Sequence, residues 1–414
     1  MKSKVHICIV TPGALGSNPR AVKEAHALYE AGYDVTVLST RTLELVDAFD
    51  DDVLKSAAWK SRRINLGKQN KWRFFRTIQA ANGLLFRLTG LSYFAEWGFS
   101  AFTLPLYRAA LEIRADLYIA HYPAALPAAA MAAKRYSGLL AYDAEDFFLG
   151  DYADVPEFTV TRSMIHVIEE RYIFGCAYVT AASPGIASAY VNVYGIKLPE
   201  VVLNVFPLAD APANATAAGV VIPGPSVYWF SQTIGPDRGL ECAIKAIGRA
   251  RSRPHLYMRG TLAEGFRERI ELIAGAAGAV GRCHIWPPDV PSKMVMLACA
   301  YDVGLVGETG KSRNRQIALT NKQFTYFLAG LPAVMSDVPA NCQLAQEVGI
   351  AAAIYTADDY ESLAASLDRI FENPFELAAA RHEAFRLGQE RFNWDVEKTV
   401  VLTCVADALA GRSG

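Results

Sequence analysis

The sequence predicts an α/β protein built from two doubly wound, Rossmann-like domains, and three observations predict this class. Short apolar runs alternate with helical patterns along the chain, as expected for parallel strands that are buried on both faces. The first strand leads through a glycine-bearing turn into a helix and a second strand. The same strand–helix pattern restarts within a proline-rich stretch at residues 207–236, with a strand at 227–230.

The elements of the first half follow from these apolar runs in order. Residues 5–10 form the first strand, and the turn after it contains Gly13 and Gly16. A helix with a regular apolar face then ends at Gly32, where the second strand approaches. The strands expected next are 35–38, 116–120, 139–142, 177–181 and 201–205, and the helices are 125–136, 161–174 and 183–194.

The second half repeats the alternation. Strands are expected at 227–230, 256–259, 284–286, 303–306 and 333–335, and helices at 240–250, 266–274, 293–300 and 322–329. A chain of 414 residues exceeds the ~250–300 that one hydrophobic core supports, so two domains are expected. We place the domains at 1–207 and 208–388 and a final segment at 389–414, with a linker at 209–219.

Composition excludes several classes of protein. With 52% hydrophobic and 20% charged residues the chain is not disordered or of low complexity. The net charge of −1 argues against a global electrostatic grip on nucleic acid. The seven cysteines are scattered without a CxxC pair, which favours buried thiols in a reducing cytoplasm over a disulfide framework or a zinc finger. The apolar run at the start is too short for a signal peptide, and no stretch has the pattern of a membrane span.

Residues 53–95, the basic aromatic segment, stand apart from this balanced composition. They contain aromatic residues and a leucine-rich helical stripe, and no acid. This composition suits a helix lying on an anionic membrane surface. The alternative is a helix packed on the first domain with a solvated basic face, and nucleic-acid contact is disfavoured because no such motif accompanies it. The nine cations are Lys55, Lys60, Arg62, Arg63, Lys68, Lys71, Arg73, Arg76 and Arg87.

Two motifs in the second half predict an anion site. Arg238 lies where a polar loop meets a helix, and a strand–loop–helix N-terminus binds anions through its amides, to which a guanidinium adds bidentate reach. Lys322 opens a helix, where a lone cation opposes the dipole unless an anion is bound. The alternatives are that Arg238 pairs with Asp237 or Glu241 and that Lys322 is an ordinary surface lysine.

Three other patterns are set aside. The GETGKS sequence at 307–312 lacks the first glycine of a P-loop because Leu305 occupies that position. The turn from Gly13 to Gly16 is not a GxGxxG fingerprint. The acidic run at 50–52 matches a DxD metal pattern, but we interpret it as a solvated loop.

With these motifs in place, the sequence resembles the retaining glycosyltransferases of family 4, which have the GT-B fold of two domains facing a cleft. The resemblance covers nearly the whole chain, and its most specific part is LTNKQFTYFLAGLPAVMSD, which is similar to the family's NK-x-F-E-Y-x-x-x-G-x-P motif. It implies a nucleotide-sugar donor in the second domain, an acceptor on the first, and a final helix around 394–409 that crosses back to the first domain.

The resemblance also implies residue roles in the donor site. Arg238 stands where the family clamps phosphate, and Asn321 and Lys322 match the pair expected near the diphosphate. The turn with Gly13 and Gly16 is expected to close over the diphosphate and sugar. The loops at Gly260, Pro288 and Val290 are expected to border the base.

Several positions depart from the family pattern. Gln232 replaces a second phosphate-binding arginine, Thr325 replaces the glutamate that holds the ribose, and the family's other glutamate falls on Ile317. Glu308 is our candidate for contacting the donor sugar instead. In the first domain, His121 and Asp146 follow strands and are candidates for acceptor contact or general base work, the alternative for His121 being a structural histidine.

The sequence therefore predicts a metal-independent glycosyltransferase without a cofactor. Its substrates are a nucleotide sugar, with UDP preferred to GDP, and a carbohydrate or lipid-linked acceptor of bacterial polysaccharide or glycolipid assembly. We expect a cytoplasmic protein that is either soluble or peripheral at the inner face of the membrane. The alternatives are a degenerate nucleotide-sugar-binding scaffold and a GT-B-type nucleotide-sugar epimerase or phosphorylase.

Overall fold

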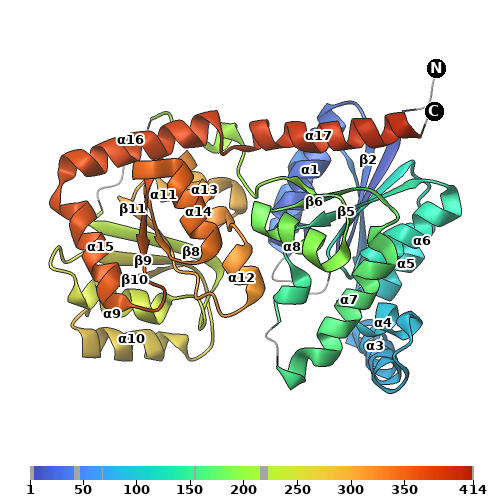
Figure 1. Ribbon diagram of the computed structural model, residues 1–414, viewed down its shortest axis with the longest axis horizontal. Coiled ribbons are helices and arrows are strands. Elements are labelled where there is room, and N and C mark those ends of the chain that lie inside the picture. Colours follow the sequence, from blue (N-terminus) through green and yellow to red (C-terminus); the bar gives the residue numbers. More distant parts are fainter. Residues whose placement is uncertain (1–3, 42–46, 68, 153–154, 215–221, 413–414) are drawn as a thin grey trace. The chain divides into compact units, whose positions relative to one another are not determined.

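The computed structural model describes residues 4–41, 47–67, 69–152, 155–214 and 222–412. The chain divides into two compact units, each with its own parallel sheet (Figure 1). The first unit comprises residues 1–202, 312–314 and 398–414, and the second comprises 203–311 and 315–397. Part of the linker expected at 209–219 lies outside the described residues.

The first unit contains a seven-stranded sheet in the order β3-β2-β1-β4-β5-β6-β7. Its strands are β1 (His6–Val10), β2 (Asp34–Arg41), β3 (Lys60–Asn65), β4 (Leu117–His121), β5 (Leu139–Ala144), β6 (Cys176–Ala181) and β7 (Glu200–Val201). Its helices are α1 (Pro19–Glu30), α2 (Asp47–Ser56), α3 (Gln69–Thr89), α4 (Ser92–Gly98), α5 (Thr103–Ala110), α6 (Leu126–Tyr136), α7 (Thr159–Ile173) and α8 (Pro184–Tyr194).

The second unit contains a six-stranded sheet in the order β10-β9-β8-β11-β12-β13. Its strands are β8 (Ser226–Ile234), β9 (His255–Leu262), β10 (Cys283–Trp286), β11 (Val303–Val306), β12 (Ala333–Ser336) and β13 (Ala352–Tyr355). The helices of this half of the chain are α9 (Leu240–Arg249), α10 (Phe266–Ala277), α11 (Met294–Ala298), α12 (Arg313–Ile317), α13 (Asn321–Leu328), α14 (Pro339–Val348), α15 (Tyr360–Glu372), α16 (Pro374–Glu390) and α17 (Trp394–Gly411). Helix α17 begins in the second unit and ends in the first.

Burial on both faces explains the continuous apolar strands. All of Ile7–Val10 is buried, and the neighbouring strands β2 and β4 add their own apolar side chains. In the second unit, α9 lays Leu240, Ile244 and Ile247 against Val227 and Trp229 of β8. These are the residues that the apolar runs and the helical periodicity mark in the sequence, because both patterns report burial against a sheet. The predicted class of two Rossmann-like α/β domains is confirmed.

Three predictions are wrong. The strand expected at 201–205 is limited to Glu200–Val201. The segment at 50–52 is not a solvated loop, because it lies in α2 and Asp50 is completely buried, accepting a hydrogen bond from the Gly16 amide at 2.8 Å. The basic aromatic segment is not helical throughout, because Lys60–Asn65 pairs in parallel with β2 as the edge strand β3.

The seven cysteines are free thiols. In the part of the chain that the structure describes, no helix has both the length and the apolar character needed to cross a bilayer.

Candidate functional site

The strand order of the second unit predicts where a ligand would bind. The sheet reverses its winding between β8 and β11, and open α/β sheets bind ligands at the carboxyl ends of the two strands that flank such a switch. Arg238 lies in the connection that follows β8, and Glu308 lies just after β11. The two predicted residues therefore lie at the switch point.

A glycine contact brings these two connections together. Gly239 has a φ of 71° and precedes the first residue of α9. A Cβ on Gly239 would collide with the carbonyl oxygen of Gly307, so only glycine permits this close approach. Arg238 is thereby held next to the backbone that leads into Glu308.

Three cations gather around the carboxylate of Glu308. Arg315 donates from Nη1 to Oε2 at 3.0 Å, and the Nζ of Lys322 lies 3.7 Å from Oε1. Arg238 donates to the hydroxyl of Ser231 at 3.4 Å and interacts electrostatically with Glu308 and Arg315. The cluster thus has three cations and one acid among these residues. Such an excess of positive charge at a sheet switch point is suited to a polyanion.

Both alternatives for the two basic residues are wrong. Asp237 pairs with Lys311, and Glu241 pairs with Arg269, so neither is the partner of Arg238. Lys322 is buried rather than at the surface, and its ammonium lies 5.8 Å from the ring centroid of Trp229.

The pKa shifts of these cations have the same origin. Burial lowers the pKa of Lys322, and the nearby charges of Arg238 and Arg315 lower it further against the pull of Glu308. Burial also lowers the pKa of Arg238, and repulsion from Arg315 adds to the effect. A bound dianion would offset this repulsion between the cations and raise their pKa values again. The charge of the cluster therefore favours binding of a dianion.

The other predicted donor-side residues fall into two groups. Gln232 on β8 and Pro288 after β10 are exposed, and Gly260 in β9 packs its backbone against the carbonyl of Ser231. The amide of Val290 donates to Asp289 at 2.8 Å. These positions lie at or beyond the carboxyl half of their strands, on the same edge as Arg238.

Asn321 and Thr325 lie on the first turns of α13. Asn321 is partly exposed at the helix start, beside Lys322. Thr325 is completely buried, and its hydroxyl donates to the carbonyl of Asn321 at 2.8 Å. Ile317 is likewise buried. In this structure the two positions where the family carries glutamates therefore contribute no exposed side chain.

The first unit has a second cluster at its own switch point, between β1 and β4. His121 ends β4 and is completely buried; its Nδ1 lies 2.8 Å from Glu145 and its Nε2 lies 2.7 Å from Glu24. Asp143 accepts two hydrogen bonds from Arg20, at 2.5 and 2.8 Å. Burial alone would lower the pKa of His121, but the hydrogen bonds to Glu145 and Glu24 raise it to about 10.

This geometry makes His121 an imidazolium held among carboxylates. His121, Asp143 and Glu145 present ligand atoms within 4.8 Å of one another, a grouping that a metal ion also uses. Here each carboxylate already has a cationic partner, since Arg20 holds Asp143 and the imidazolium contacts Glu145. The residue that follows, Tyr122, has a φ of 67°, an unusual conformation for a bulky side chain.

Asp146 lies beyond the end of β5. Its Oδ1 accepts a hydrogen bond from Asn314 at 2.9 Å, and Asn314 also accepts from the amide of Phe147. Burial raises the pKa of Asp146 to about 7, with Asp151 adding to the shift and Asn314 opposing it. A carboxyl group with a pKa near neutrality is suited to exchanging protons.

The glycine turn after β1 has its amides in use. The amide of Gly13 donates to Thr40 at 2.9 Å, and that of Gly16 donates to the buried Asp50. These contacts fix the turn to the first unit and leave neither amide available for a ligand in this conformation.

Sequence reasoning missed Arg315, Arg20 and Glu24. Arg315 lies in a short helix that no periodicity predicts, and only the fold brings it to Glu308. Arg20 and Glu24 stand on the buried side of α1, four residues apart. Charges on the otherwise apolar face of a helix were the available signal, because such charges are buried only with partners.

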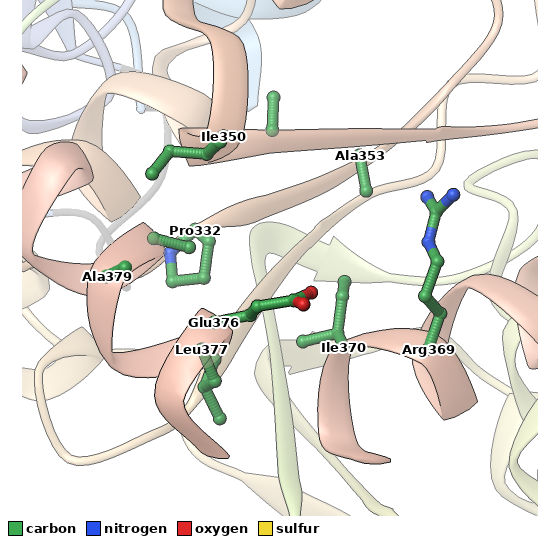
Figure 2. A pocket seen from close by; sticks show the side chains of 10 residues that line it. Pro332, Ile350, Ala353, Arg369, Ile370, Glu376, Leu377 and Ala379 are labelled. Carbon is green, nitrogen blue, oxygen red and sulfur yellow. The ribbon is translucent and has the colours of Figure 1, made fainter. Parts of the chain in front are cut away.

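A cavity of about 250 Å³ in the second unit is lined by none of the residues of the Arg238 cluster. Figure 2 shows the side chains that do line it. Pro332 directly precedes β12, and Ala352 and Ala353 begin β13, so the cavity is at the amino ends of the strands. Its lining is mostly apolar, with Arg369 and Glu376 from α15 and α16. Ligands of doubly wound sheets bind at the opposite edge, and we assign this cavity no role in donor binding.

Comparison with known proteins shows the fold. No family model matches the chain, and no curated protein matches it. Anabaena HepE in complex with UDP-glucose superposes with a TM-score of 0.69 at 16% identity, covering 97% of this chain and 99% of HepE. Sucrose-phosphate synthase from Thermosynechococcus elongatus gives a TM-score of 0.70 at 13% identity over 99% and 100% of the two chains.

The lipopolysaccharide outer core galactosyltransferase WaaB gives a TM-score of 0.63 at 13% identity over 97% of this chain and 99% of WaaB. Together with the two parallel sheets, these similarities show that the chain has the GT-B fold of these glycosyltransferase structures.

Proposed function

We propose that this protein is a glycosyltransferase that moves a sugar from a nucleoside diphosphate sugar to an acceptor. The observation that carries the proposal is the convergence of Arg238, Arg315 and Lys322 on Glu308 at the switch point of the second sheet. A diphosphate is the polyanion that this arrangement fits, because its two phosphates can replace the single carboxylate as partners of the cations.

The chemistry follows from where charge develops. The bond between the anomeric carbon and the β-phosphate oxygen breaks, and its electron pair passes to the diphosphate. The acceptor hydroxyl forms the new glycosidic bond and loses its proton. Cations that are fixed in place before the reaction stabilise the developing charge without reorganisation, and in many enzymes such stabilisation contributes most to the rate enhancement. We assign Arg238 and Lys322 to the diphosphate and Glu308 to the donor sugar.

We propose a UDP-sugar as the donor, without a metal or a cofactor. The HepE structures with UDP and with UDP-glucose support the choice of nucleotide, since HepE shares the fold. In this proposal Gly260, Pro288 and Val290 border the base, Asn321 lies near the diphosphate, and Gln232 and Thr325 stand where stronger donor contacts are usual. The second unit is the donor domain, and the first is the acceptor domain.

We further propose transfer with retention of configuration, as in family 4, to a carbohydrate or lipid-linked acceptor of bacterial polysaccharide or glycolipid assembly. On the acceptor side, Asp146 is the proposed proton acceptor because its pKa is near 7. The buried His121 imidazolium is proposed to position Glu145 rather than to take a proton itself. The proposed location is the cytoplasmic face of the membrane.

One observation favours a second candidate function, a nucleotide-sugar-binding protein without turnover. Thr325 and Ile317 are both buried, so the ribose has no glutamate partner at either position. An epimerase is a third function that the same fold supports.

One experiment separates these functions. The full-length protein is incubated with a panel of UDP- and GDP-sugars, with and without acceptor panels, and the products are identified by mass spectrometry and NMR. Transfer of the sugar to an acceptor supports the proposal. Conversion of the donor alone identifies an epimerase, and nucleotide binding without any product identifies a binding protein.

A further inference from the structure

Helix α3 carries apolar side chains on two faces. One face packs into the first unit, where Phe86 is buried and Trp72 lies against Phe102 at a ring distance of 5.3 Å. The crossing with α4 at Gly83 and Gly98 is so close that no Cβ fits at Gly98. The helix is therefore held firmly along this packed face.

The other face is exposed and equally apolar. Leu88 is 72% exposed, Leu84 58% and Phe74 53%, and Leu85 lies on the same side of the helix. Leu91 and Tyr93, just beyond the end of the helix, are each 58% exposed. A solvated basic face, the alternative interpretation of this segment, does not require large apolar side chains in water.

Arginines flank this exposed apolar stripe. Arg73, Arg76 and Arg87 are exposed on α3, and among the described residues none of them has a carboxylate within ion-pairing distance. Elsewhere in the basic aromatic segment, Lys55, Lys60, Arg62 and Arg63 do pair with acids. Lys68 lies outside the described residues. The unpaired positive charge of the segment is thus concentrated on α3.

A groove adjoins the first turns of this helix. It has a volume of about 600 Å³ and lies between β3, the start of α3 and α5. Lys71 and Arg108 line it and have no ion-pair partner among the described residues, whereas Arg62 shares it with its partner Glu112. Phe74 belongs to both the groove and the exposed stripe, and Phe75 contacts it edge-on at 5.3 Å.

We propose that this face of the first unit docks on anionic phospholipid. The groove at Lys71 and Arg108 takes the head-group phosphate, and the stripe of Phe74, Leu84, Leu85 and Leu88 enters the boundary between head groups and acyl chains. This docking rests on the membrane location given under the proposed function, and these are the residues that would hold the protein there.

Charge and geometry favour lipid over other occupants. An amphipathic helix with an exposed apolar stripe and flanking arginines lies in the plane of a bilayer surface, where each basic residue near anionic lipid strengthens binding by about fivefold. The 21 residues of α3 extend about 31 Å, long enough to present several anchors at once. A soluble phosphate ester would engage the groove but would leave the leucines exposed.

The test is co-sedimentation of the full-length protein with vesicles. We expect binding to phosphatidylcholine vesicles that contain about a third phosphatidylglycerol, and weak binding to phosphatidylcholine alone. The double variant Lys71→Glu/Arg108→Glu is expected to lower the partition coefficient at least tenfold. Its matched control is Lys134→Glu/Arg267→Glu, which changes charge equally at two exposed cations elsewhere and should stay within about twofold of the wild type.

A second pair of variants, one on the apolar stripe and one control elsewhere, tests the role of the exposed leucines. Leu88→Ser should weaken vesicle binding several-fold, whereas Leu272→Ser, at a leucine that is 70% exposed on α10, should leave it unchanged. Equal binding by the wild type and both α3-face variants would overturn the proposal, as would an absence of vesicle binding at low salt.

Two further experiments distinguish lipid binding from binding of a soluble phosphate, and membrane docking from the proposed catalysis. Dihexanoyl phosphatidylglycerol below its micellar concentration and inorganic phosphate are titrated by calorimetry. Binding of phosphate alone, without vesicle binding, would replace the lipid site by a soluble-anion site and overturn the proposal. Lys322→Met should bind vesicles like the wild type, so a failed donor site leaves this result untouched.

Discussion

The Nζ of Lys322 lies 3.7 Å from Oε1 of Glu308, while the other oxygen of that carboxylate is held by Arg315. A buried lysine at the first turn of a helix is unfavourable both for desolvation and for the helix dipole. Glu308 offsets part of that cost, and a bound diphosphate would offset more. In the proposed function, the donor phosphates bind where Lys322 and Glu308 meet.

Replacing either phosphate-side cation should mainly impair turnover. We expect Lys322→Met or Arg238→Ala to lower kcat by ~10²-fold, the usual effect of losing one fixed donor to a developing charge. Steady-state kinetics with the best UDP-sugar and acceptor measure this. Arg267→Ala, on the exposed side of α10, serves as the control, and near-normal kcat in both site variants would remove these residues from the mechanism.

Arg315 is predicted to act as the second cation of the diphosphate site, in the place that Gln232 leaves unfilled. Arg315→Ala should weaken UDP binding about tenfold or more, as expected for one charge-assisted hydrogen bond, and Arg315→Lys should recover only part of it. Isothermal titration of UDP gives both values. If Arg315→Ala binds UDP like the wild type, the residue serves only as the partner of Glu308.

The buried His121 should stabilise the first unit in a pH-dependent manner. Its pKa in the fold is about 10, above the ordinary value of 6.5, so the stabilisation is complete below pH 6.5 and is lost as pH rises toward 10. His121→Ala leaves Glu24 and Glu145 without their cation and should cost about 3–5 kcal/mol at neutral pH. Urea denaturation between pH 6 and about 10 should show the wild type converging on the variant, with the exposed His382→Ala as control. A constant gap across that range would contradict a buried imidazolium.

The buried Asp146 should also make the stability of the first unit depend on pH, because its pKa is raised rather than lowered. Its pKa of about 7 exceeds the ordinary 3.8, so the folded state binds the proton more tightly, and stability falls as pH rises through 7. Asp146→Asn should remove this fall, each pKa unit being worth about 1.4 kcal/mol. Denaturation at pH 5 and pH 8 measures it, with the exposed Asp407→Asn as control. A stability difference between the wild type and Asp146→Asn that is the same at pH 5 and pH 8 would show that the carboxylate is already ionised in the fold at pH 5.

The strands were predictable because burial on both faces produces continuous apolar runs, and β1, β8 and β11 all show them. The edge strand β3 escaped prediction because KSRRIN carries three cations, which an edge strand tolerates by facing solvent. The run at 50–52 was wrongly predicted to be a solvated loop. Asp50 is paired with Gly16 and Arg63, and these two partners lie on other elements, so the local sequence does not reveal the contacts.

The clusters around Glu308 and His121 were only partly predictable, because they too depend on contacts between residues that are far apart in the sequence. Arg238 and Lys322 stand in recognisable loop–helix junctions, which the local sequence displays. Arg315 reaches Glu308 only through the fold, and His121 meets Glu24 across 97 residues of chain. Local patterns report burial and capping, whereas the pairing of distant charges depends on strand order.

The most direct test of the central claim is calorimetric titration of UDP into the wild type and into Lys322→Met, with thermal denaturation to confirm that the variant is folded. We predict that the wild type binds UDP, that the ligand raises its melting temperature, and that the variant binds UDP at least tenfold more weakly. A wild type that binds no nucleoside diphosphate, or a folded variant that binds UDP with unchanged affinity, would contradict the claim.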